Sequence, residues 1–130
     1  MIFAIDGREL PRLHIINYSI KTETLDGEAT GRTKAYGWPM IRDAEGQIIN
    51  LAIEFATTNS KEPDFIYLWN VIRSMGNREF CSVKFVDPTG ATIQQNMYVV
   101  MSELRYRRIE KNGIIYTDSI RVAFIAEKGT

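Results

Sequence analysis

Four segments of the chain alternate apolar and other residues with a period of two. In the clearest segment, from Ile49 to Phe55, four apolar side chains are separated by Asn50, Ala52 and Glu54. The other three segments have their apolar positions at Ile16, Tyr18 and Ile20; at Cys81, Val83 and Phe85; and at Ile120, Val122 and Phe124. Successive side chains of a strand point to opposite faces of a sheet. The pattern therefore predicts four strands, each with one buried face, as the core of the protein.

One segment, from about Ser60 to Met75, changes to helical periodicity. Its apolar side chains recur three or four residues apart: Phe65, Leu68, Trp69, Ile72 and Met75. It also contains residues that suit a first helical turn: Glu62, Pro63 and Asp64. We expect Ser60 to cap this helix and Gly76 to end it in a left-handed conformation. The helix should pack on the sheet through Phe65, Leu68 and Ile72, with Ile72 buried.

Short turn-forming segments separate the predicted strands. They are Asp6-Gly7, Ala44-Glu45-Gly46, Asp87-Pro88-Thr89-Gly90 and Lys111-Asn112-Gly113. This spacing is typical of antiparallel hairpins, and the length suits one domain. We therefore predict a single α+β domain over residues 1–130, a mostly antiparallel β-sandwich or open barrel with one flanking helix.

The segment from about residue 26 to 42 has no strand or helix pattern. It contains three glycines, and Arg32, Lys34, Tyr36 and Trp38 lie among them as large basic or aromatic residues. Loops of this length are uncommon in compact domains unless they have a function. We expect this arm to reach a neighbouring subunit through those four side chains. The alternative is an arm that folds back on its own core and buries Trp38.

Composition restricts the classes of partner. Sixteen basic residues balance sixteen acidic residues, so the chain has no net field that would attract nucleic acid or anionic lipid. The single cysteine, Cys81, cannot form an internal disulfide, which is typical of a protein that folds in a reducing cytoplasm. The N-terminal residues do not form a signal peptide, and the longest apolar run, Met97 to Met101, is too short to span a membrane.

The residue types that usually carry catalysis are sparse. His14 is the only histidine and lies in a predicted strand, where a sheet-surface role is expected. Cys81 would be a nucleophile only if His14 approached it in space, and its apolar neighbours instead indicate a packed thiol. The glycines near Gly27 lack the lysine and the helix of a phosphate loop. We expect no catalytic residue, no metal and no cofactor.

A basic cluster occurs near the last predicted turn, at Arg105, Tyr106, Arg107, Arg108 and Lys111. Basic groups beside an aromatic ring suit binding to single-stranded nucleic acid. Glu103 and Glu110 flank the cluster, which favours a solvated strand face paired to acidic neighbours. A third interpretation is that the arginines contact carboxylates of an adjacent subunit.

The order of motifs resembles that of small tail proteins of Gram-positive prophages. The resemblance is based on Gly31-Arg32-Thr33, on Gly37-Trp38-Pro39-Met40-Ile41-Arg42-Asp43, and on the isoleucine-rich strand and capped helix that follow. The layout is also similar to the tail-tube fold of long-tailed phages and type VI secretion tubes, in which a β-sandwich or open barrel with one helix forms stacked rings.

The resemblance implies a non-enzymatic structural component of a phage or prophage tail, as a tube, hub or tail-completion protein. Its partners would be its own copies, in a ring, and other tail proteins, with no membrane and with nucleic acid only as DNA passing through a tube. It would be assembled in the bacterial cytoplasm and reside in the virion tail. The alternatives are a small nucleic-acid-binding β-barrel and, after that, an uncharacterised enzyme.

Overall fold

The structure of the protein is a computed structural model. It describes the backbone of residues 3–26, 31–32, 40–41 and 44–127, and the side chains of residues 3–23 and 47–127. The elements are β1 (Phe3–Ile5), β2 (Arg8–Glu9), β3 (Ile15–Asp26), β4 (Gly31–Arg32), β5 (Met40–Ile41), β6 (Ala44–Phe55), α1 (Pro63–Ser74), β7 (Cys81–Val86), β8 (Thr92–Val100), β9 (Tyr106–Ile109), β10 (Ile115–Thr117) and β11 (Ile120–Ala126). The fold is α+β and mostly antiparallel β with one helix among the described residues, as the sequence predicts.

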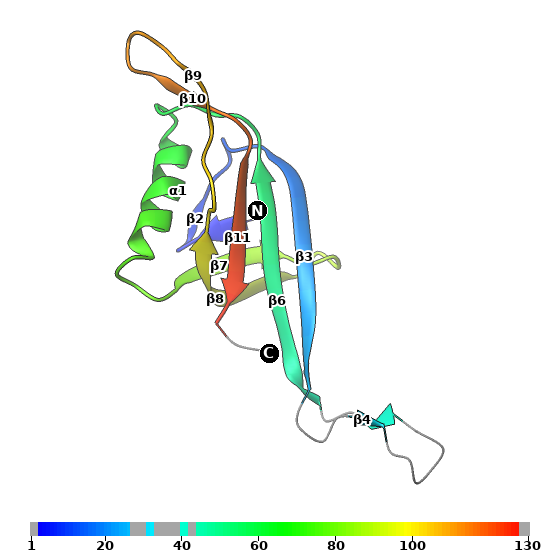
Figure 1. The fold of residues 1–130 in the computed structure, drawn as a ribbon. Coiled ribbons are helices and arrows are strands. Elements are labelled where there is room, and N and C mark those ends of the chain that lie inside the picture. The colour runs from blue at the N-terminus through cyan, green and yellow to red at the C-terminus, as the bar shows by residue number, and fades with distance from the viewer. Residues whose placement is uncertain (1–2, 27–30, 33–39, 42–43, 128–130) are drawn as a thin grey trace.

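One sheet dominates the molecule (Figure 1). It has seven strands in the order β2-β1-β7-β8-β11-β6-β3, and neighbouring strands are antiparallel. Two smaller sheets, β9 with β10 and β4 with β5, have two strands each. The edges of the large sheet are therefore β2, which is two residues long, and β3, which is twelve.

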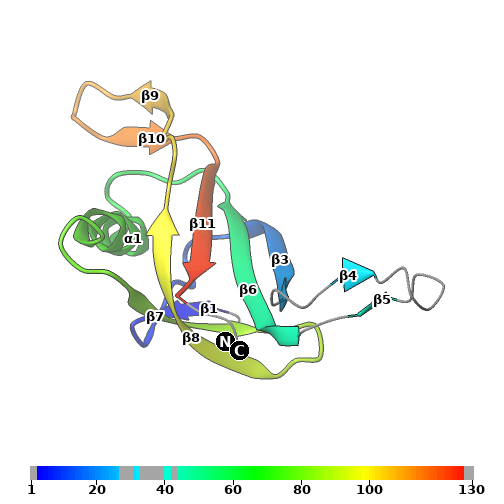
Figure 2. The ribbon, with the colours of Figure 1, turned by 60° about the horizontal axis from the view of Figure 1, so that its bottom comes forward.

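The large sheet is strongly curved, because aromatic rings from distant strands meet. Phe3 on β1 lies with its ring centroid 5.0 Å from that of Phe124 on β11, although β7 and β8 separate these strands in the sheet. In a flat sheet the two strands would be about 14 Å apart. Figure 2 shows the corresponding turn of β7 away from the direction of β11 and β6. The concave side encloses the core, while the choice between sandwich and open barrel stays a prediction.

Three of the four predicted alternations are confirmed. The inward residues of β6, β7 and β11 are buried at Leu51, Ile53 and Phe55; at Cys81, Val83 and Phe85; and at Ile120, Val122 and Phe124. The prediction for the first strand is wrong at Ile16, whose side chain is 52% exposed. The pairing of β3 with β6 shifts between Ile15 and Asn17. This bulge inserts one residue, so Ile15 packs toward the core with Tyr18 and Ile20 instead of Ile16.

The helix forms where the sequence predicts it, but with different ends. Glu62, and not Ser60, caps α1, because its carboxylate accepts a hydrogen bond from the backbone N–H of Asp64 at 3.3 Å. The hydroxyl of Ser60 accepts instead from the backbone N–H of Ile115 at 3.0 Å. Gly76 is not left-handed, since the chain stays right-handed at Met75 and continues in short turns after it.

The buried face of α1 is centred on Leu68. The buried residues of the helix are Asp64, Phe65, Leu68 and Val71. Ile72 packs against the core but is only half-buried, so the prediction that it is buried is wrong, and Trp69 is 39% exposed. At about 100° per residue, Ile72 lies between Leu68 and Phe65 around the helix, so its angle alone does not explain its partial exposure; it belongs to the last turn of α1, which ends at Ser74.

A polar contact also fixes the helix to the first hairpin. The carboxylate of Asp64 accepts from the guanidinium of Arg8 at 3.2 Å and from the backbone N–H of Arg12 at 2.9 Å. The Tyr67 hydroxyl donates to the carbonyl of Ile5 at 2.9 Å. Since Asp64 is buried, these donors offset the loss of water around its charge.

Three of the four predicted turns are confirmed. Asp6 and Gly7 both have positive φ, 50° and 83°, which is the geometry of a two-residue hairpin between β1 and β2. Residues 87–90 connect β7 to β8, and residues 111–113 connect β9 to β10. The turn predicted at Ala44-Glu45-Gly46 is wrong, because these residues belong to β6 and pair with the end of β3.

The arm predicted between residues 26 and 42 is in part regular. Gly31 pairs with Ile41 and Arg32 with Met40, so β4 and β5 form a short antiparallel ladder. Figures 1 and 2 show this ladder set apart from the large sheet. The prediction of a segment without strands is therefore wrong at these positions. The side chains of Arg32, Lys34, Tyr36 and Trp38, proposed for the subunit interface, lie outside the described residues.

Candidate assembly surfaces

The β9–β10 hairpin extends from the end of the molecule next to the start of α1 (Figure 1). Its turn is closed by hydrogen bonds from the N–H of Gly113 to the carbonyl of Glu110, and from the N–H of Ile114 to the side chain of Asn112. Gly113 has φ of 87°, which explains the preference for glycine there. Local turn chemistry thus determines where the hairpin reverses.

Among the described backbone hydrogen bonds, those that tie this hairpin's strands to residues 58–60 involve β10 and not β9. The backbone of Ile115 on β10 accepts from the N–H of Ser60 at 2.8 Å, and the N–H of Thr117 donates to the carbonyl of Thr58 at 2.9 Å. By contrast, all four residues of β9 are exposed. Among them Tyr106 is 56% exposed and Ile109 is 64% exposed. The outer strand of the hairpin therefore presents both apolar and basic side chains to solvent.

The predicted basic cluster maps onto this hairpin, with mixed pairing. Arg105 forms an ion pair with Glu103 at 2.6 Å, and Arg108 forms one with Glu110 at 3.1 Å. Arg108 also lies over the ring of Tyr116, 4.4 Å from its centroid. Arg107 and Lys111 form no ion pair within the described part of the chain. The sequence interpretation of pairing to acidic neighbours is confirmed for two of the four cations.

A groove of about 560 Å³ runs beside the hairpin. It is lined by Thr57, Thr58, Asn59, Arg107, Arg108, Tyr116 and Thr117. Its lining combines hydroxyl and amide groups with guanidinium groups, a combination that suits carboxylates or phosphates. The groove brings Arg107 and Arg108 together with residues 57–59, which the sequence analysis did not single out. Residues 57–59 reach the groove because β10 is hydrogen-bonded to the segment that contains them.

The convex face of the large sheet forms a second exposed surface. Ser19, Ala52, Ala123 and Val100 are opposite one another on β3, β6, β11 and β8. These small side chains line the floor of a hollow of about 460 Å³. Tyr98 and Val100, at 38% and 40% exposed, continue the apolar surface along β8. The sequence pattern predicts an outward face here but not its apolar character.

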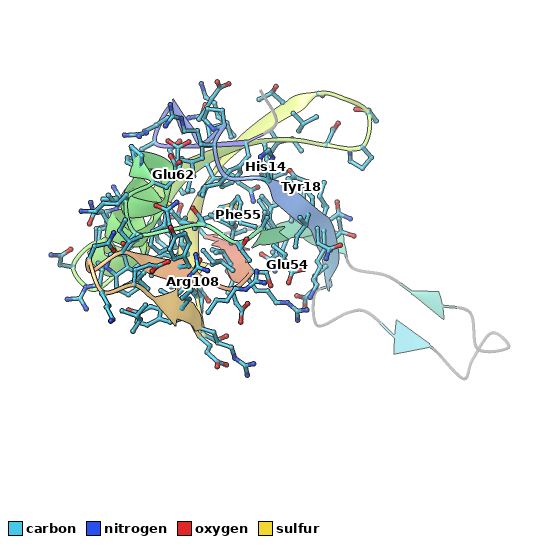
Figure 3. The ribbon with its side chains drawn as sticks, turned by 90° about the horizontal axis from the view of Figure 1, so that it is seen from above. His14, Tyr18, Glu54, Phe55, Glu62 and Arg108 are labelled. Atoms are coloured by element: carbon cyan, nitrogen blue, oxygen red, sulfur yellow. The ribbon has the colours of Figure 1, made fainter. Side chains whose placement is uncertain are left out.

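Charged residues close one end of this hollow. Glu54 accepts hydrogen bonds from the Asn17 amide at 2.7 Å and from the Arg121 guanidinium at 3.0 Å. These two donors hold the pKa of Glu54 below its usual value. Glu54 and Phe55 are neighbours on β6 that point to opposite faces of the sheet (Figure 3). The convex face thus combines an apolar floor with a fixed carboxylate.

The residues considered for catalysis are not brought together by any described contact. Cys81 is buried on β7, where its thiol donates to the carbonyl of Met97 at 3.3 Å. Burial raises the pKa of this thiol, which favours its uncharged form. His14 is exposed just before β3 (Figure 3), and its carbonyl accepts from the N–H of Ala56. Cys81 therefore packs as a small apolar residue.

Across the described residues, no three histidine, cysteine or acidic side chains gather into a group that could bind a metal. In the same part of the chain, no helix is long and apolar enough to cross a membrane. Comparisons with models of protein families, with curated proteins and with solved structures found no match to this chain.

Proposed function

We propose that the protein is a non-enzymatic structural component of a phage or prophage tail, which assembles with its own copies and docks onto other tail proteins. The observation that carries the proposal is the β9–β10 hairpin, a two-stranded extension that exposes Tyr106 and Ile109. Two-stranded hairpins are marginally stable alone in water, and exposed apolar groups on an extension are typical of contact sites. The hairpin is therefore well suited to packing against another subunit.

The assignment to a tail is based on the resemblance in motif order together with the mostly antiparallel fold and its one described helix. In this proposal, copies form a ring, and the hairpin and the arm make contacts between subunits or with other tail proteins. Tube, hub and tail-completion roles are all compatible with it. The protein would be assembled in the cytoplasm of the bacterial host and remain in the virion tail.

Binding to single-stranded nucleic acid is the second candidate function. It is favoured by Arg107 and Lys111, which have no described acidic partner and lie on the same hairpin as the exposed ring of Tyr106. Against it, Arg105 and Arg108 are already paired with glutamates. A gel-shift titration with single-stranded DNA at low and high salt separates the two functions, because binding to phosphates weakens steeply with salt.

The first prediction concerns the exposed apolar residues of β9. Replacing Tyr106 and Ile109 together with serine is expected to weaken self-association by about tenfold or more, because it removes an aromatic and an aliphatic contact. Sedimentation velocity over a range of concentrations measures the change, and circular dichroism shows whether the fold persists. The control is Ile66→Ser, which changes an isoleucine that is 44% exposed on α1. Equal effects of the two variants, or unchanged association of the first, would contradict the role of the hairpin.

A further inference from the structure

The outer edge of β3 is a long strand edge with which no described residue pairs. β3 pairs with β6 along one side and is last in the order of the large sheet. On its other side, the described residues contribute no ladder partner. On the inner face of β3, the side chains of Ile15, Tyr18 and Ile20 line a hollow of about 630 Å³ together with Val86, Asp87 and Pro88. An exposed edge of this length presents unpaired N–H and C=O groups that can pair with another strand.

Two opposite charges lie two residues apart on this edge. Lys21 and Glu23 are exposed, and their side chains point to the same face of the sheet. Within the described part of the chain neither of them forms an ion pair or a side-chain hydrogen bond. A lysine on an edge strand usually opposes strand addition. If the incoming strand is β3 of a second copy, Glu23 of that copy can lie across from Lys21 and supply the opposite charge.

We propose that a second copy of this chain adds to β3 in antiparallel orientation, with Thr22 opposite Thr22 of that copy. This inference rests on the proposed self-association and names one of its contacts, a two-fold contact that is separate from the head-to-tail contacts between neighbours within a ring. In an antiparallel pair centred on Thr22, Lys21 of each copy lies opposite Glu23 of the other. Two ion pairs form across the junction, and the two large sheets continue into one another. Directly opposite charges on one face of a sheet stabilise strand pairing.

The charges also discriminate against other arrangements. A parallel pairing in register would place Lys21 next to Lys21 and Glu23 next to Glu23, which is destabilising. An antiparallel pairing centred on Ile20 would leave Lys21 opposite Ser19 and Glu23 opposite Asn17, with no ion pair. Centring on Thr22 pairs residues 19–25 of the two strands and leaves both irregularities of β3, between Ile15 and Asn17 and between Leu25 and Asp26, outside the contact. This register therefore combines regular backbone with complementary charge.

Contacts within the fold keep β3 in the strand conformation that such pairing requires. The hydroxyl of Tyr18 donates to the carbonyl of Val86 at 3.2 Å, which ties β3 to the end of β7 from the inner side. Along the side of β3 that pairs with β6, the ladder runs without a shift from Asn17 to Leu25. An edge that is already in strand conformation loses little conformational freedom when a partner strand adds to it.

Charge reversal tests the proposed pairing. Lys21→Glu is expected to weaken self-association by about tenfold, because two attractive pairs become repulsive, and Glu23→Lys should have the same effect. The double variant Lys21→Glu with Glu23→Lys restores both pairs across the two-fold axis and should associate like the wild type. Sedimentation velocity measures all four proteins. If the single variants associate normally, or if the double variant is no better than either, the β3 pairing is wrong.

A cysteine scan tests the register without relying on affinity. Thr22→Cys places two thiols opposite each other, within reach of a disulfide, so mild oxidation should give a covalent dimer. The control is Ser19→Cys, because in this register the two copies of residue 19 lie roughly 20 Å apart and should not cross-link. Equal cross-linking of both variants, or none at residue 22, overturns the proposal. If the wild type associates while residue 22 does not cross-link, the pairing fails and the proposed self-association stands.

Discussion

Replacing Phe124 with alanine is expected to lower the free energy of unfolding by about 3–5 kcal/mol. Phe124 is fully buried on β11, and its ring meets that of Phe3 edge-on at 5.0 Å between centroids. The variant leaves a cavity where the two halves of the curved sheet face each other. Urea unfolding followed by circular dichroism measures the loss.

The matched control for this variant is Ile125→Ala, which changes the next residue of the same strand. Ile125 points to the convex face and is half-buried, so its truncation should cost clearly less than that of Phe124. Equal losses for the two variants would mean that the concave side of the sheet is not the core. The comparison therefore tests the curvature of the sheet as well as the burial of one ring.

Leu68→Ala should destabilise the protein by about 2–5 kcal/mol, the range for truncating a fully buried leucine. Leu68 is 1% exposed at the centre of the buried face of α1. Ile66, two residues earlier in the helix, is 44% exposed, so Ile66→Ala should change stability by roughly 0.5 kcal/mol or less. Thermal unfolding of both variants at one protein concentration gives the comparison. A larger loss for Ile66→Ala would show that the helix packs through another face.

The strands that could be predicted from sequence are those whose pattern is not interrupted. Leu51, Ile53 and Phe55 keep a strict period of two and are all buried. The prediction failed at Ile16, because a β-bulge changes which face a residue occupies without changing the composition around it. It failed at Ala44-Glu45-Gly46 because tertiary pairing with β3 overrides local turn preference.

The candidate surfaces were predicted only in part. The arginines of the β9–β10 hairpin are visible as a run in the sequence, but the pairing of Arg105 and Arg108 with glutamates depends on side-chain geometry. The exposure of Ile109 follows from a hairpin that extends beyond the sheet, which no local pattern indicates. The position of β3 at the edge of the large sheet depends on the order of all seven strands. Sequence-distant pairings, which determine that order, are not encoded in any one segment.

The central claim is that this protein works by assembling with its own copies. Its most direct test is the mass of the purified wild-type chain, measured by multi-angle light scattering as protein concentration is raised. We expect the mass to increase from that of the monomer, 14.9 kDa, to a defined multiple of it. A mass that stays at 14.9 kDa up to the highest soluble concentration would contradict the claim.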